Sequence, residues 1–301
     1  MAPHRDELGH LVTVAQELDL GKAPKVHRDQ TVVDGYRVSA LRWHPEDVEM
    51  VALHGAALNA HTWDATLLAT GLPTLALDLP GHGESEWRED GDYRAQVIAP
   101  TVAGAIDRLL PPQGTKPLLV GHSLGGLTAA IIAARNPERW RGLAIIDILP
   151  REGENPGASY LEEFFSRKRE FETLQEAVDY AGSFGLGGDP VQLRRGVKLN
   201  TRLNAAGKIV WKHHLGNMEH LNLFRAGSAE IWPALEQLAA AALPIVLVRA
   251  ENGIVSDEEV TEFTARVPQG IVLTLGTGHN VQEEDPVALA ELLRELANET
   301  A

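Results

Sequence analysis

The residues most suggestive of chemistry are Gly121-His122-Ser123-Leu124-Gly125, a G-x-S-x-G pattern. An apolar run at 118–120 leads into this pattern, and an Ala-rich segment at 127–135 with helical character follows it. In a strand-to-helix setting the serine sits on a sharp, strained turn, where side chains two positions before or after it would collide. The helix N-terminus also directs free N–H groups and its positive dipole end at the serine oxygen. The pattern therefore predicts that Ser123 is a nucleophile.

A serine hydroxyl becomes an effective nucleophile when a base removes its proton, and histidine does this near neutral pH. Twelve histidines are present, and His279 is the one that follows an apolar run, 271–275, in a Gly-rich turn. His54 and His122 lie beside the serine by motif, and we expect them to pack against or hydrogen-bond the loops. His279 is the predicted general base.

A carboxylate that would orient the histidine is less clearly marked. Asp147 ends the apolar run 143–146, so it should emerge at the carboxyl edge of a sheet, on the side of Ser123, where a buried charge needs a partner such as a histidine N–H. Asp257 and Glu251 are alternatives, although Asp257 lies in a Ser-Asp-Glu-Glu sequence typical of a helix cap. Asp147 is preferred, and both alternatives stay open.

The elements that must position these residues alternate between strands and helices. Residues 30–42 alternate apolar and polar side chains around Asp34-Gly35, which predicts an antiparallel hairpin. Short apolar runs, each followed by a loop and then helical periodicity, predict further strands at 48–53, 73–77, 117–120, 143–148, 244–248 and 271–275. Such alternation indicates an α/β fold with a mostly parallel sheet covered by helices on both faces.

The alternation is interrupted at 150–232, where helical stretches replace strands and predict an inserted, mainly helical cap. Within it, residues 201–214 have the character of a small hairpin. The core then comprises 29–149 and 233–301. Residues 1–28 have no clear partner in the pattern and are expected to be a peripheral extension.

Composition excludes several classes of function. The formal net charge of −15 argues against a nucleic-acid partner, which would need clustered Lys and Arg. The chain has no cysteine, so disulfides, zinc-thiolate sites and a catalytic thiol are excluded, and a reducing cytoplasm is expected. No stretch reaches the ~20 apolar residues of a spanning helix, so no membrane span is expected.

Together with the serine pattern, three further motifs resemble those of the α/β-hydrolase family. Leu-His-Gly-Ala at 53–56 follows the third predicted strand, Asp-Leu-Pro-Gly-His-Gly-Glu-Ser at 78–85 follows the next, and Gly-His-Asn at 278–280 follows the last. The resemblance covers nearly the whole chain outside the cap. It implies about eight strands, the chain order Ser, acid, His, and an oxyanion hole formed by the backbone N–H groups of Ala56 and Leu124. The 78–85 loop is expected to be structural.

The sequence departs from this family at the acid. Gly253 occupies the position after the 244–248 strand where an aspartate is expected. Some members of the fold carry the acid at the end of the preceding strand, which is where Asp147 lies.

The resemblance implies a cytosolic serine hydrolase that acts on a small to medium carboxylic ester through an acyl-enzyme, with no cofactor or metal. Thioesterase, lactonase and carbon–carbon hydrolase chemistry use the same three residues and remain alternatives. A lyase or cofactor-independent oxygenase, and a weakly active ligand-binding protein, are further alternatives. The oligomeric state is left open.

Overall fold

The computed structural model describes residues 7–110, 115–153, 162–165, 168–184, 189–217 and 228–299. The strands of its main sheet are β1 (Val26–Val33), β2 (Tyr36–Trp43), β3 (Met50–Leu53), β4 (Thr74–Leu77), β5 (Leu118–His122), β6 (Gly142–Ile146), β10 (Ile245–Asn252) and β11 (Ile271–Gly278). They form one eight-stranded sheet in the order β1-β2-β4-β3-β5-β6-β10-β11. Pairing is antiparallel between β1 and β2 and between β2 and β4, and parallel elsewhere. The predicted hairpin and all six further predicted strands are confirmed.

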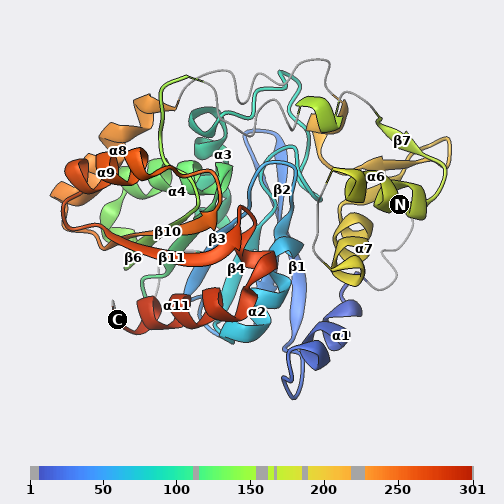
Figure 1. Cartoon of the computed structure of the whole chain (residues 1–301), viewed down its shortest axis with the longest axis horizontal. Coiled ribbons are helices and arrows are strands. Elements are labelled where there is room, and N and C mark those ends of the chain that lie inside the picture. The colour runs from blue at the N-terminus through green and yellow to red at the C-terminus, as the bar shows by residue number, and fades with distance from the viewer. Residues whose placement is uncertain are drawn as a thin grey trace.

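Helices cover both faces of this sheet because its strands are apolar on both sides (Figure 1). Along β3, Met50 and Ala52 pack on one face, and Val51 and Leu53 on the other. Burying each large apolar side chain contributes roughly 1.5–3 kcal/mol relative to leaving it exposed. The first face carries α1 (His10–Glu17), α2 (Asp64–Thr70) and α11 (Pro286–Glu299), and the second carries α3 (Ala95–Leu109), α4 (Leu124–Arg135), α8 (Trp232–Ala240) and α9 (Asp257–Arg266). A short helix, α10 (Val281–Glu284), precedes α11.

The segment between β6 and α8 contains helices and a second sheet. Its helices α6 (Leu174–Ser183) and α7 (Pro190–Leu199) are grouped with β7 (Glu170–Phe171) at one side of the molecule (Figure 1). β8 (Thr201–Leu203) and β9 (Ile209–Trp211) form the hairpin predicted within 201–214, and β7 adds a third strand that was not predicted. Aromatic rings pack together here, among them Phe164, Phe171, Tyr180 and Trp211.

The described part of the N-terminal segment, expected to be a peripheral extension, packs against the core through α1. Leu11, Val14 and Ala15 of α1 are buried in the same apolar cluster as α2 and α11. A polar contact also joins this segment to the core, because His10 Nε2 lies 2.6 Å from Asp64 Oδ2 at the start of α2. Among the described residues, no helix combines the length and the apolar character needed to cross a membrane.

Candidate active site

Ser123 sits in a strained turn between β5 and α4. Its backbone has φ 51° and ψ −122°, a combination that non-glycine residues adopt only where the surrounding structure enforces it. The flanking glycines allow close packing: a Cβ at Gly121 would lie 2.3 Å from the carbonyl oxygen of Gly125, and one at Gly125 would lie 2.4 Å from that of Leu53. These contacts explain why the serine is bracketed by glycines.

Two of the other predicted residues meet directly. His279 Nδ1 lies 2.8 Å from Asp147 Oδ2, and the Asp147 side chain is fully buried. The carboxylate also accepts hydrogen bonds from the N–H groups of Ala250 (3.1 Å, to Oδ1) and Ile254 (2.9 Å, to Oδ2). With three donors around it, this buried carboxylate is well satisfied, and its hydrogen bond to Nδ1 orients the His279 ring.

The alternative carboxylates lie elsewhere. Asp257 begins α9, its side chain is 84% exposed, and it pairs with Arg249. Glu251 is exposed on β10. At Gly253, a Cβ would lie 2.1 Å from Asp147 Oδ2, so the space that a side chain at 253 would use is filled by the Asp147 carboxylate.

His122 connects the serine turn to the His279 loop. Its Nε2–H donates to the carbonyl oxygen of His279 at 2.9 Å, and the two rings lie 4.6 Å apart. Burial, reinforced by His279, holds the pKa of His122 well below its usual range, so the ring is neutral. His122 therefore does what was expected of it, hydrogen-bonding a loop, and it brings the chain at Ser123 next to His279.

The predicted oxyanion segment after β3 is fixed by His54. The Nδ1–H of His54 donates to the carbonyl of Gly55 at 2.7 Å, and Nε2 accepts from the Leu79 N–H at 2.9 Å. Burial lowers the pKa of His54 to about 4, so the ring is neutral, and its two hydrogen-bond partners set the tautomer. In a trans peptide the C=O and the following N–H point in opposite directions. Holding the Gly55 carbonyl therefore sets the direction of the Ala56 N–H.

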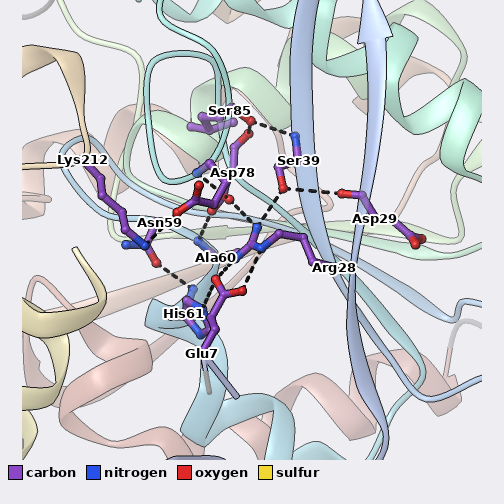
Figure 2. Close-up of polar contacts among 12 residues, drawn as sticks. Glu7, Arg28, Asp29, Ser39, Asn59, Ala60, His61, Asp78, Ser85 and Lys212 are labelled. Carbon is purple, nitrogen blue, oxygen red and sulfur yellow. Dashed lines mark hydrogen bonds and ion pairs between the residues drawn. The ribbon is translucent and has the colours of Figure 1, made fainter. Parts of the chain in front are cut away.

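A buried ionic network holds the chain that follows this segment at Ala60 (Figure 2). Asp78 Oδ1 accepts from the Ala60 N–H at 2.8 Å, and Asp78 Oδ2 pairs with Arg28 at 2.7 Å. Burial, the largest influence, raises the pKa of Asp78, but Arg28 and the backbone donors outweigh it and hold that pKa below its usual value. Arg28 in turn pairs with Glu7 in the N-terminal segment. Within the 78–85 loop, Asp78 Oδ2 accepts from the Glu84 N–H at 3.0 Å and Ser85 Oγ donates to the Asp78 carbonyl at 2.6 Å, so the polar residues hold the loop, as predicted.

Asn200 joins the segment between β6 and α8 to the chain that follows the predicted oxyanion residue Ala56. Asn200, at the end of α7, donates from Nδ2 to the carbonyl of Ala57 at 2.6 Å, and its Oδ1 accepts from Asn59 Nδ2 at 3.1 Å. Ala57 has φ 65°, a strained value for alanine. None of Arg28, Asn59 or Asn200 was singled out by the sequence patterns.

A cavity of about 450 Å³ lies away from these residues. Its lining includes Lys116, Arg141 and Pro244, which precede β5, β6 and β10. It therefore opens at the amino ends of the strands, opposite to Ser123, Asp147 and His279.

Comparison with known proteins agrees with the fold. A sequence model described as "Alpha/beta hydrolase family" matches residues 50–292. The esterase Rv0045c of Mycobacterium tuberculosis is 35% identical over 298 residues, covering 96% of this chain and 95% of that protein. A crystal structure of that esterase has a TM-score of 0.82 to this chain at 33% identity, covering 99% of this chain and 100% of the other. The sn-1-specific diacylglycerol lipase ABHD11 of Mus musculus is 26% identical over 80% of this chain and 77% of its own length. By sequence and by structure, the chain belongs to the α/β hydrolase family.

Proposed function

We propose that this protein is a carboxylic-ester hydrolase in which Ser123, His279 and Asp147 form a catalytic triad. The observation that carries this proposal is the 2.8 Å contact of His279 Nδ1 with the buried Asp147 carboxylate, beside a serine in a strained strand-to-helix turn. The likeness to a mycobacterial esterase over nearly the whole of both chains supports ester hydrolysis.

In this mechanism the Ser123 hydroxyl attacks the ester carbonyl while His279 takes its proton through Nε2. Asp147 holds the imidazole in the correct tautomer and stabilises the imidazolium. The N–H groups of Ala56 and Leu124 bind the oxyanion, where losing one donor typically costs ~2.7–4 kcal/mol of barrier. His279 then protonates the departing alcohol, and a water activated by the same histidine releases the acid and restores Ser123.

The substrate is a small-molecule ester, because the resemblance is to enzymes of ester chemistry and the strong negative charge disfavours polyanionic partners. Residues 150–232 act as the cap that selects the acyl group, between core segments 29–149 and 233–301. A cytoplasmic location is part of the proposal and is supported by the absence of cysteine.

The test is hydrolysis of p-nitrophenyl esters of increasing acyl length by the wild type and by Ser123→Ala, His279→Ala, Asp147→Asn and Asp257→Asn. The last variant is a matched control, since it neutralises an exposed carboxylate near the same sheet edge. Turnover abolished by the first two changes, strongly reduced by the third and unaffected by the control supports the triad. A folded wild type that hydrolyses no ester overturns the proposal, and turnover that survives Ser123→Ala overturns the mechanism.

A further inference from the structure

Two imidazoles converge on one carboxylate between α1 and the start of α2. His10 Nε2 lies 2.6 Å from Asp64 Oδ2, and His61 Nδ1 lies 2.9 Å from the same oxygen. The three side chains are 17%, 3% and 6% exposed for His10, His61 and Asp64 respectively. The other oxygen, Asp64 Oδ1, is buried and has no hydrogen-bond partner among the described residues. The mechanism proposed above uses none of these groups.

The far sides of both rings are held by acceptors. His10 Nδ1 faces the backbone carbonyl of Glu7 at 2.9 Å, and His61 Nε2 faces the Glu7 carboxylate at 3.1 Å. Arg28 fixes that carboxylate in turn, as Figure 2 shows for Glu7, His61 and Arg28. Histidines that bind metals almost always donate their other ring N–H to a backbone carbonyl or a carboxylate, which sets the tautomer that ligates. Both arrangements occur here, one on each ring.

The charges in this cluster leave room for a divalent cation. Every ring nitrogen of His10 and His61 faces an oxygen that can only accept a hydrogen bond. Glu7, Asp64 and Asp78 contribute three negative charges, and Arg28 one positive charge. One divalent ion would balance the two negative charges that remain.

We propose that His10 Nε2, His61 Nδ1 and the Asp64 carboxylate form a binding site for a divalent transition-metal ion such as Zn²⁺. These atoms all lie within 4.8 Å of one another. Ligands of a tetrahedral zinc with bonds of ~2.0–2.1 Å are separated by about 3.3 Å, so the site needs only small outward shifts of the rings. As the ion binds, it replaces any proton on the two ring nitrogens that face Asp64, and such a proton leaves to solvent. Imidazole nitrogen with carboxylate oxygen is a donor set that suits zinc, nickel and copper.

The ion at this site is structural. It links α1, which carries His10, to the 3-10 helix Ala60–Trp63, which carries His61, and to the first residue of α2, Asp64. We therefore expect the metal to raise thermal stability and to pin the N-terminal segment against α2. No step of ester hydrolysis passes through it, so this inference and the triad proposal can fail independently.

The experiment is calorimetric titration of the EDTA-treated, dialysed full chain with ZnCl₂, together with thermal melts. His10→Gln and His61→Gln each remove one ligand, and Glu7→Gln weakens the partner of the outer nitrogen of His61. The matched control is His27→Gln, which alters an exposed histidine that also faces a carboxylate, that of Asp29, at 3.2 Å.

We expect the wild type to bind about one equivalent of Zn²⁺ and to melt at a higher temperature with it, since a ligand that binds only the folded state stabilises it. His10→Gln and His61→Gln should each weaken binding at least tenfold, Glu7→Gln by about 10- to 100-fold, and His27→Gln should change nothing. Co²⁺ substitution should give visible absorption bands in the wild type that His10→Gln abolishes, with circular dichroism confirming that the variant is folded. A wild type without an equivalent of bound Zn²⁺ overturns the proposal. Undiminished binding in folded His10→Gln also overturns it and would assign the ion to other histidines.

Discussion

Gly253 faces the carboxylate of Asp147 so closely that a Cβ at 253 would lie 2.1 Å from Oδ2. Asp147 directly follows β6, the neighbour of β10 in the sheet, and Gly253 directly follows β10. The two positions therefore compete for one volume beside His279. A carboxylate from either strand could reach this volume, but both could not occupy it together.

The acid should accordingly be transferable between the two strands. Asp147→Gly should lower kcat by on the order of 10³–10⁴-fold, because the imidazole loses its orientation and charge partner. Adding Gly253→Asp to that variant should raise kcat at least tenfold above that of Asp147→Gly, since the vacated volume accepts the new carboxylate. Asp147 has φ 46°, so glycine is tolerated there without strain. Steady-state kinetics on a p-nitrophenyl ester measures both effects.

Gly253→Asp alone serves as the control for this exchange. With Asp147 in place, it should destabilise the fold and reduce activity through steric and charge conflict. A double variant no more active than Asp147→Gly would show that position 253 cannot supply the acid.

His54 is predicted to act on catalysis through the Gly55–Ala56 peptide. His54→Phe keeps an aromatic ring at this position but removes both hydrogen bonds of the imidazole. The Gly55 carbonyl and the Ala56 N–H then lose their fixed direction. We expect kcat to fall about 10- to 100-fold, less than the full loss of an oxyanion donor, with KM changed little. A fall in stability of about 1–3 kcal/mol accompanies it, because the Leu79 N–H is left unpaired.

His82→Phe is the matched control, since His82 is equally buried and its ring lies 5.2 Å from that of His54. It should lower stability while leaving kcat close to that of the wild type. Equal losses of kcat in both variants would mean that His54 acts only through packing.

The strands and the candidate triad could be predicted because their signals are local. Ser123, Asp147 and His279 each directly follow a strand or end an apolar run, and parallel strands bring their carboxyl ends to one edge. The sequence showed Gly253 only as a missing carboxylate. The reason for a glycine at 253 is that the Asp147 carboxylate fills the space of a side chain. This depends on the pairing of β6 with β10 and was found only in the structure.

The supporting contacts could not be predicted because they join residues far apart in the chain without any repeating pattern. Arg28 and Asp78 are separated by 50 positions, and Asn59 and Asn200 by 141. A single arginine or asparagine in a loop gives no periodic signal. For the same reason, no sequence pattern connects His10 with His61 and Asp64. His10 lies in a segment that was expected to be peripheral, more than 50 positions before the other two.

Asn200 should couple the cap to the oxyanion segment. Asn200→Ala removes the hydrogen bond to the strained Ala57 carbonyl, a contribution of about 1 kcal/mol, and we expect a roughly fivefold fall in kcat. Gln192→Ala, on the exposed face of α7, is the control and should behave as the wild type. If both variants keep wild-type kcat, the cap does not act through this contact.

Stability should decline as the pH falls below about 6.5, the ordinary pKa of histidine. Burial lowers the pKa of His54 to about 4 and that of His82 to about 3, so both stay neutral in the folded chain. Between pH 6.5 and the pKa values of the folded chain, the unfolded chain binds these protons and the folded chain does not. The free energy of unfolding therefore falls as the pH falls through this range. Each histidine contributes up to about 1.4 kcal/mol per pH unit in that window. Urea unfolding at several pH values between about 7 and 5 measures the slope, and His82→Gln should make it shallower. A free energy of unfolding that stays constant over this range would mean that these histidines accept protons in the folded protein.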